Sequence, residues 1–360
     1  MKKLIFIGVV IMAVLSSCKS KSKSFINYAP VSGINVENLE LEKSWDKVFE
    51  KNENVEHKKV VFPNHFGITL AADLYRPKAF SGRLPAIAVS GPFGAVKEQS
   101  SGLYAQEMAS RGFVTLAFDP SFTGESSGEP RFMNSPDINV EDFQAAVDYL
   151  CSLDEVDKDK ISIIGICGWG GMAIQTACID TRIKATVAST MYDMSRVAGN
   201  GYFDADDNKE ARKKAREALA KQRNEDFKNK TYKLSGGVVE NISDDMPEFV
   251  KDYHAYYKTK RGYHKRSLNS NGGWTANTSS SLLNTRLFTY ASEIDSAILI
   301  VHGEKAHSRY FGEDAFKLLK GDNKELLIVP GATHCDLYDG GDSNYIPFDK
   351  IEDFIRRNIK

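Results

Sequence analysis

The most regular feature of this chain is a series of short apolar runs, rich in β-branched residues, that alternate with helical segments. Continuous apolar strands of this kind are buried on both faces, which requires a parallel sheet covered by helices. The runs are Ala86 to Val89, Phe113 to Phe118, Ile161 to Ile166, Ile183 to Ala188, Ile298 to Val301 and Leu326 to Val329. The sequence therefore predicts an α/β fold with a mostly parallel, doubly wound sheet.

Two further elements are predicted ahead of that series. Apolar residues near helical spacing between positions 35 and 52, among them Trp45 and Phe49, predict a leading helix. Val55 to Phe62 and Ile68 to Tyr75 follow as strand-like runs separated by turn-forming residues. This pair predicts an antiparallel hairpin that opens the sheet.

One long interval, residues 194–292, interrupts the alternation. A structureless loop of that length is implausible in a compact domain, so we expect an inserted cap between two parts of a core, 35–193 and 293–360. Its charged stretch, Lys209 to Lys230, predicts a solvated helix. The aromatic-rich segment after Pro247 fits two roles equally well, lining a ligand cleft or packing the cap onto the core.

The N-terminal residues predict processing and membrane attachment. Two lysines precede an apolar run, residues 4–15, that is too short to span a bilayer comfortably and is typical of a secretory signal. The junction at Cys18 resembles a bacterial lipoprotein box, which implies a signal peptide over 1–17 and lipidation of Cys18; an ordinary secretory peptide is the alternative. Alternating Lys and Ser then predict a flexible tether over 18–34. We expect a lipid-anchored protein of the bacterial cell envelope, on the periplasmic face of the outer membrane.

Composition excludes several classes of function. The chain has 360 residues, of which 42% are hydrophobic, so it is neither disordered nor collagen-like. Its 47 basic and 48 acidic side chains give a net charge of -1, which argues against a nucleic-acid partner. The five cysteines show no CxxC or Cys/His zinc spacing, and no metal site is predicted.

The stretch from Ile161 to Ala173 carries the clearest chemical signal, because a buried strand runs into small residues and then into a helix. Cys167 stands at the corner, with Gly165 before it and Gly168 after it. A nucleophile elbow needs this context, a tight turn that exposes the side chain at a helix N-terminus. We expect the helix dipole to favour the reactive thiolate. A small buried residue in a turn is the alternative role for Cys167.

A cysteine nucleophile needs a base, and His334 is the strongest candidate among the seven histidines. It lies just past the last predicted strand, where a loop would hold the imidazole over the carboxyl edge of the sheet. His302 and His307 are rivals, because they lie at the end of the preceding strand and within a turn of it.

Backbone amides are the predicted stabilisers of an oxyanion. One donor should be the N–H of Gly168, directly after the nucleophile, and the second should come from the loop after the strand that ends at Val89. Pro92 has no N–H, so Phe93 or Gly94 is the second donor, with Phe93 preferred.

The order of strands, the cysteine elbow, the insertion before the penultimate strand and the late histidine resemble the α/β-hydrolase superfamily. Within it they resemble the dienelactone-hydrolase-like branch, which uses Cys in place of Ser. The resemblance covers about residues 55–360 and implies the fold and the reaction class, but not the substrate. It includes the stretches Gly94 to Gln99, Asp119 to Ser126, Met191 to Arg196 and His302 to Ser308.

Two features depart from the resemblance. Trp169 stands two positions after the nucleophile, where a small residue is usual, a change that would shift the turn or the start of the helix. The His-Gly-x-x-Asp pattern after the penultimate strand ends in Ala306, so the expected carboxylate is missing. Glu304 in the same loop and Asp193 after the preceding strand are the two substitutes, with Glu304 slightly favoured. A Cys–His dyad held by another group is the third option.

The predicted activity is hydrolysis of an ester, lactone or thioester through an acyl-enzyme on Cys167, with a small-molecule acyl substrate and no cofactor. Acyl transfer at the same site is one alternative. The other is a binding lipoprotein whose elbow has lost catalysis.

Overall fold

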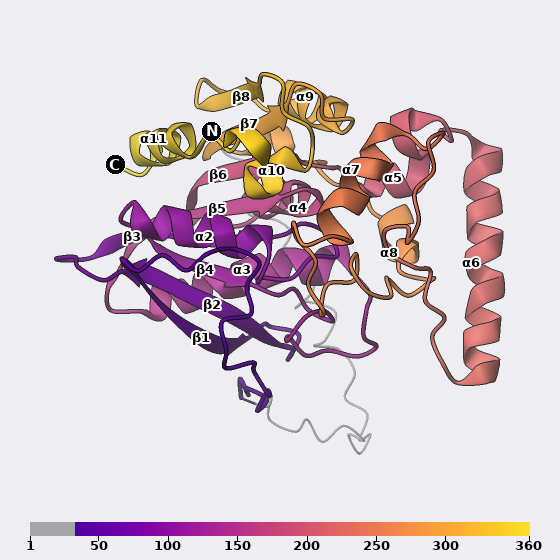
Figure 1. Cartoon of the computed structure of the whole chain (residues 1–360), viewed down its shortest axis with the longest axis horizontal. Coiled ribbons are helices and arrows are strands. Elements are labelled where there is room, and N and C mark those ends of the chain that lie inside the picture. The colour runs from indigo at the N-terminus through magenta and orange to yellow at the C-terminus, as the bar shows by residue number, and fades with distance from the viewer. Residues whose placement is uncertain (1–32) are drawn as a thin grey trace, which may run out of the picture. The chain divides into compact units, whose positions relative to one another are not determined.

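The computed structural model describes residues 33–360, which build an eight-stranded sheet with helices on both faces (Figure 1). The strand order across the sheet is β1-β2-β4-β3-β5-β6-β7-β8. The strands are β1 (Val55–Pro63), β2 (Thr69–Pro77), β3 (Leu84–Ser90), β4 (Val114–Phe118), β5 (Val156–Ile166), β6 (Ile183–Ser189), β7 (Ala297–Gly303) and β8 (Lys324–Val329). The predicted α/β fold is confirmed.

The strands pair antiparallel at the start of the sheet and parallel afterwards. β1 pairs with β2 and β2 with β4 in antiparallel fashion, which confirms the hairpin, and the other neighbouring pairs are parallel. The register sets Ser90 opposite Gly165, Ile166 opposite Ser189, and Ser189 opposite Val301. Residues that follow β3, β5, β6 and β7 therefore meet at one edge of the sheet.

Helices cover the two faces of the sheet. α2 (Ser100–Ser110) and α11 (Phe348–Asn358) pack against each other and share one apolar core cluster. α3 (Pro136–Ser152) and α4 (Gly168–Ala177) pack together and belong to the other cluster. α9 (Arg309–Leu318) lies against β7 and β8. Both faces of the central strands are thus dry, which explains their uninterrupted apolar sequences.

The leading helix expected over residues 35–52 is wrong, because the described part of this segment has no regular secondary structure. Individual contacts hold it to the core instead. The Lys47 ammonium lies 2.9 Å from the Asp73 carboxylate, and both side chains are fully buried. The Val48 N–H donates to the Glu98 carbonyl over 3.0 Å. These tertiary contacts outweigh a weak local preference for helix.

The interval between β6 and β7 carries helices joined by long irregular segments, and it lies at the right of Figure 1. It contains α5 (Met194–Asn200), α6 (Lys209–Asn229), α7 (Glu248–Tyr257) and α8 (Ser279–Leu283). α6 has no buried residue, as expected of the predicted solvated helix. α7 buries Tyr256 and Tyr257 and so joins the insertion to the apolar cluster shared by α2 and α11.

The predicted signal peptide over 1–17, the lipidation at Cys18 and nearly all of the tether over 18–34 lie outside the described residues, so they stay predictions. Within residues 33–360, no helix has both the length and the apolar character needed to cross a bilayer.

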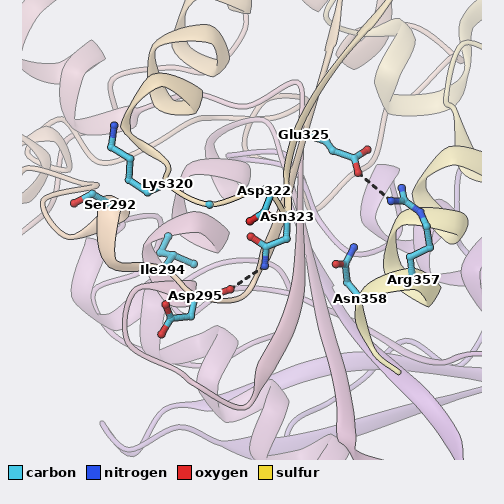
Figure 2. Close-up of a pocket in the computed structure, with 10 residues that line it drawn as sticks. Ser292, Ile294, Asp295, Lys320, Asp322, Asn323, Glu325, Arg357 and Asn358 are labelled. Carbon is cyan, nitrogen blue, oxygen red and sulfur yellow. Dashed lines mark hydrogen bonds and ion pairs between the residues drawn. The ribbon is translucent and has the colours of Figure 1, made fainter.

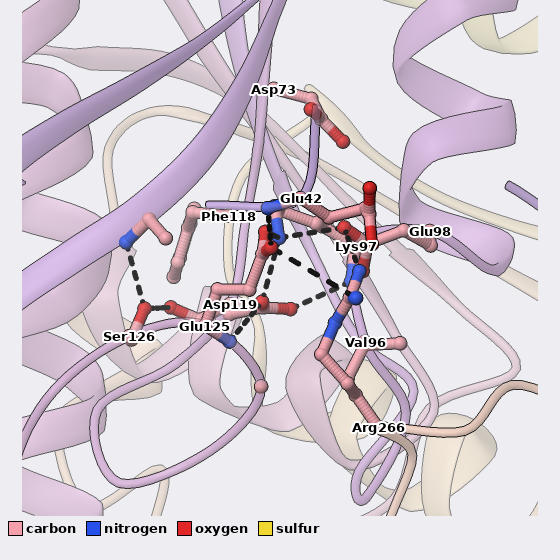
Figure 3. Close-up of polar contacts among 12 residues, drawn as sticks. Glu42, Asp73, Val96, Lys97, Glu98, Phe118, Asp119, Glu125, Ser126 and Arg266 are labelled. Carbon is pink, nitrogen blue, oxygen red and sulfur yellow. Dashed lines mark hydrogen bonds and ion pairs between the residues drawn. The ribbon is translucent and has the colours of Figure 1, made fainter. Parts of the chain in front are cut away.

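A buried cluster of charged side chains, here called the Lys97 cluster, lies at the loop after β3 (Figure 3). The Lys97 ammonium is 2.7 Å from Glu98, 2.9 Å from Asp119 and 2.5 Å from Glu125. Arg266 from the insertion completes the cluster, 2.8 Å from Glu98. Burial alone would lower the pKa of Lys97, but the surrounding carboxylates raise it well above its usual value. The cluster therefore ties the loop after β3 to the loop after β4 and to the insertion.

Replacing the central cation should destabilise the protein strongly. In Lys97→Met, buried carboxylates lose their main counterion, and we expect the free energy of unfolding to fall by about 3 to 5 kcal/mol. Urea denaturation followed by circular dichroism measures this change. Lys317→Met is the matched control, because its ammonium pairs with Asp314 on a side chain that is 72% exposed; it should leave the free energy of unfolding essentially unchanged. Equal losses in the two variants would contradict a structural role of the cluster.

Candidate active site

Cys167 occupies a strained turn between β5 and α4. Its backbone has φ 59° and ψ −128°, a conformation that a residue with a side chain rarely adopts. The turn depends on small neighbours, because a Cβ on Gly165 would lie 2.0 Å from the Trp169 carbonyl oxygen. The predicted elbow geometry is therefore present at Cys167.

Trp169 does not displace the helix, contrary to the expected shift. α4 begins at Gly168, directly after the nucleophile position. The indole is buried and meets the rings of Phe118 and Phe143 edge-on, with centroids 5.8 Å and 5.5 Å away. The large side chain thus fills the core on the α3 side of the sheet and leaves the turn unchanged.

Two backbone N–H groups, those of Phe93 and Gly168, lower the pKa of the Cys167 thiol, so both amides face the sulfur. They are the two donors that the sequence predicts for an oxyanion. The Phe93 peptide is held from behind, since the Asn269 side-chain amide donates to the Phe93 carbonyl over 2.8 Å. The Phe93 ring stacks on Trp274 with centroids 4.3 Å apart. Residues of the insertion therefore fix one half of this donor pair.

The Cys167 thiol is 7% exposed, and burial raises its pKa above the usual value. Hydrogen bonds from Tyr338, from the Phe93 and Gly168 amides and from Tyr253 oppose that rise without cancelling it. Burial therefore opposes the thiolate that the helix dipole is expected to favour. Desolvation of the charged sulfur is the larger effect.

His334 is 1% exposed and has partners at both ring nitrogens. Nδ1 lies 2.8 Å from the Thr190 hydroxyl and 2.6 Å from the Ser308 hydroxyl. Nε2 lies 2.9 Å from the Tyr338 hydroxyl. Because hydroxyl oxygens can accept from Nδ1–H, this arrangement holds the tautomer in which Nε2 is free to act as a base.

Thr190 and Ser308 follow β6 and β7, the two strands after which the family resemblance predicts the acidic residue. Thr190 directly follows β6 and has φ 44°, a rare conformation for a β-branched residue. Ser308 precedes α9 in the connection after β7. Sequence reasoning missed both. Ser308 closes a stretch that carried the family resemblance, so its position was a usable signal, whereas Thr190 gave none.

Neither predicted carboxylate lies at the imidazole. Glu304 is exposed and accepts a hydrogen bond from the Gly331 N–H over 2.8 Å. Asp193 caps α5, where it accepts from the Arg196 N–H over 3.0 Å. Within residues 33–360, the hydrogen-bond partners of His334 include no carboxylate. The geometry matches the third option, a dyad whose imidazole is held by other groups.

Burial lowers the pKa of His334 and of the two histidines near it. Burial, with a smaller contribution from His307 and His302, lowers the pKa of His334 well below its usual value. Burial lowers the pKa of His307 to about 4 and that of His302 to about 3. His307 bonds to the Tyr192 hydroxyl, and neither nitrogen of His302 has a partner among the described residues. All three imidazoles therefore stay uncharged near pH 7.

Cys167 lies at the wall of a cavity of about 400 Å³ whose lining includes no charged side chain. Segments on both sides of α6 and the first half of α7 close it over the sheet edge. Its apolar and aromatic lining includes Phe93, Tyr192, Met194, Val197, Tyr202, Val238, Val239, Phe249, Val250, Tyr253, Trp274 and Tyr338. The aromatic segment of the insertion thus serves both suggested roles, because Tyr256 and Tyr257 pack into the core.

A second hollow is polar and lies apart from these groups. Figure 2 shows it between the β7–β8 region and α11, with Lys320, Asp322 and Asn323 on one side and the Glu325–Arg357 ion pair on the other. Its lining includes no cysteine or histidine. Over residues 33–360, no group of three or more His, Cys, Asp or Glu side chains is arranged to hold a metal ion.

A sheet of this order, with a strained elbow after β5 and a buried histidine after β8, defines an α/β hydrolase. The crystal structure of the α/β hydrolase GrgF from Penicillium sp. sh18 shares this fold, with a TM-score of 0.69, 22% identity, and coverage of 84% of this chain and 99% of that one. More specifically, the chain belongs to the X-Pro dipeptidyl-peptidase (S15) family, whose model matches residues 67–335.

Two relatives illustrate the range of similarity. The uncharacterized protein PA2218 of Pseudomonas aeruginosa is 54% identical over 323 residues, 89% of this chain and 86% of that protein. Its crystal structure superposes with a TM-score of 0.86 over 89% of this chain and 99% of that one. The thiohydrolase aneE of Aspergillus aculeatus is 32% identical over 137 residues, 38% of this chain and 42% of that protein.

The raised pKa of the Cys167 thiol predicts how its alkylation depends on pH. Only the thiolate reacts, so the rate with iodoacetamide should rise about tenfold per pH unit from pH 7 to 9. Mass spectrometry of the Cys167 peptide gives the rate, and Cys167→Ala reports the background from Cys151 and Cys178. A rate that levels off below pH 8 would indicate a stable thiolate–imidazolium pair and contradict the neutral site.

Proposed function

We propose that this protein hydrolyses an ester, lactone or thioester with a neutral, apolar acyl group, through an acyl-enzyme on Cys167. One observation carries the proposal: a cysteine on a strained elbow lies, together with Phe93, at the wall of an uncharged cavity. The use of cysteine as nucleophile, and with it membership of the dienelactone-hydrolase-like branch, is part of the proposal.

Each group at the site has a role in acyl transfer to sulfur. Cys167 attacks the carbonyl carbon while its proton passes to His334. The N–H groups of Phe93 and Gly168, which meet the sulfur in the resting protein, hold the oxygen that becomes negative. Thr190 and Ser308 keep Nδ1 in place. Water then attacks the acyl-enzyme, His334 takes its proton, and the acid leaves.

The cavity favours a neutral acyl group over a peptide substrate. A dipeptidyl-peptidase must bind the free amino group of its substrate, and a buried ammonium needs an anionic or strongly polar partner. No carboxylate is among the residues that line this cavity. The similarity to the thiohydrolase aneE supports a thioester as one substrate class.

Removal of the sulfur should abolish acyl transfer. Cys167→Ala should release no p-nitrophenolate from p-nitrophenyl hexanoate and gain no hexanoyl mass, whereas the unmodified protein should do both. A thioester of N-acetylcysteamine tests the second substrate class. Cys178→Ala, a half-buried cysteine that does not line the cavity, should behave as the parent. Full activity in Cys167→Ala would overturn the proposal, and an added alcohol that diverts the acyl group from water would favour transfer over hydrolysis.

The hydroxyls of Thr190 and Ser308 should affect the reaction rate because they orient the His334 imidazole. Ser308→Ala combined with Thr190→Val removes both partners of Nδ1, and we expect kcat to fall on the order of 10-fold to 100-fold with little change in KM, because the ring loses its tautomer and its orientation. Steady-state kinetics on p-nitrophenyl hexanoate measures the change. Thr186→Val is the matched control, since this buried β6 hydroxyl has no partner among the described residues. An unchanged kcat in the double variant would show that the hydroxyls do not hold the base.

A further inference from the structure

The thiol and the imidazole of the proposed dyad do not touch directly. Within the described chain, the hydrogen-bond partners of His334 are Thr190, Ser308 and Tyr338, and Cys167 is not among them. The Tyr338 hydroxyl lies 2.9 Å from Nε2. The Tyr338 side chain lines the same cavity as Cys167, and its hydroxyl lowers the pKa of the Cys167 thiol. Tyr338 lies on α10 (Asp336–Asp339), the short helix that follows His334.

Packing keeps this order of groups fixed. The two hydroxyls at Nδ1 prevent the imidazole from turning toward the sulfur without the loss of both hydrogen bonds. The Tyr338 ring is fully buried, with the rings of Tyr256 and Tyr257 at 5.0 Å and 6.1 Å. A phenol that moved aside would have to displace these rings, which a close-packed interior resists.

We infer that Tyr338 is a catalytic residue that carries the proton between Cys167 and His334. The inference rests on the proposed function. As sulfur bonds to the acyl carbon, the S–H bond breaks and its proton goes to the Tyr338 oxygen, while the Tyr338 O–H bond breaks and that proton goes to Nε2. The carbonyl π pair moves onto oxygen at the Phe93 and Gly168 amides. On collapse, the same path returns a proton to the departing alkoxide or thiolate, so the phenol is unchanged.

The raised pKa of Tyr338 fits a proton carrier that does not accumulate as phenolate. Burial, together with the negative charge that Cys167 would bear as a thiolate, raises the pKa of Tyr338 well above its usual value. A phenolate in this position is therefore costly, so the two proton movements occur together. A hydroxyl can accept on its oxygen and donate its own hydrogen at once, as a bridging water does.

A second hydroxyl chain competes with this path. Tyr253 lines the same cavity and also lowers the pKa of the Cys167 thiol. Its hydroxyl lies 2.8 Å from that of Tyr192, and Tyr192 bonds to His307. This route needs two hydroxyls instead of one, so it requires an additional concerted transfer. The experiment must separate the two routes.

The test is the pH dependence of acylation, measured as the burst of p-nitrophenolate from p-nitrophenyl hexanoate in the full-length protein. In Tyr338→Phe the rate at pH 7 should fall about 100-fold or more, because the thiol has lost its route to the base. The rate should then climb about tenfold per pH unit as thiolate forms without help. The parent should change little from pH 6 to 9, because His334 stays unprotonated. A merely structural role would lower the rate equally at every pH.

Three further variants complete the test. Tyr256→Phe removes an equally buried hydroxyl that does not line the cavity, and it should match the parent. His334→Gln should reproduce the profile of Tyr338→Phe, and the double variant should be no slower than the slower single one, because both changes break one path. Multiplied effects in the double variant would overturn the inference. So would an alkaline-dependent profile in Tyr253→Phe with a normal one in Tyr338→Phe.

The possible failures can be told apart. If the parent gives no burst and no hexanoyl mass on Cys167, the proposed function fails and the relay fails with it. If the parent is acylated on Cys167 and Tyr338→Phe is acylated equally fast at pH 7, the proposed function stands and the relay alone is overturned.

Discussion

The site depends above all on the backbone conformation of Cys167. Holding a residue with a side chain at positive φ costs about 1 to 3 kcal/mol, and only surroundings that leave no alternative can maintain it. Here β5 supplies the strand, and the Cys167 N–H donates to the Ser189 carbonyl while the Tyr192 N–H donates to that of Cys167. A Cβ on Gly91 would lie 2.3 Å from the Ile166 carbonyl oxygen, so the loop that carries Phe93 can approach only because this residue is glycine. The same turn thus orients the Cys167 sulfur and leaves room for the loop that carries the Phe93 amide.

No charged side chain lines the cavity at Cys167, although the protein buries a charged cluster at the loop after β3. The Lys97 cluster gathers four kinds of charged side chain behind the loop after β3, and the Lys97 N–H itself donates to Asp119 over 2.8 Å. That loop also bears Phe93, so ionic contacts fix an amide donor without placing a charge in the cavity. At the other end of the site, hydroxyls occupy the places of a carboxylate. Burial thus favours the neutral forms of both the Cys167 thiol and the His334 imidazole.

How much of the site could be predicted from the sequence depends on how far apart along the chain the interacting residues lie. Local sequence patterns predict the strands, from their apolar runs, and Cys167, from the small residues around it. Phe93 and His334 could be found because each closely follows a strand. The contacts of Thr190 and Ser308 with His334 could not, because these side chains meet the imidazole only through the register of β6 with β7 and the fold of the chain after β8. The helix expected over residues 35–52 failed for the same reason, since a distant carboxylate, Asp73, determines where Lys47 lies.

The Lys97 cluster also imposes an order on the maturation of the chain. Its lysine and carboxylates are synthesised early, but Arg266 belongs to the insertion and emerges much later, so the complete set cannot assemble until most of the polypeptide is present. The same insertion supplies Asn269 to the Phe93 carbonyl. A nascent chain that has just completed β5 and α4 therefore possesses its cysteine but lacks the finished donor pair. The support of the Phe93 peptide is therefore complete only after the insertion has packed against the loop that follows β3.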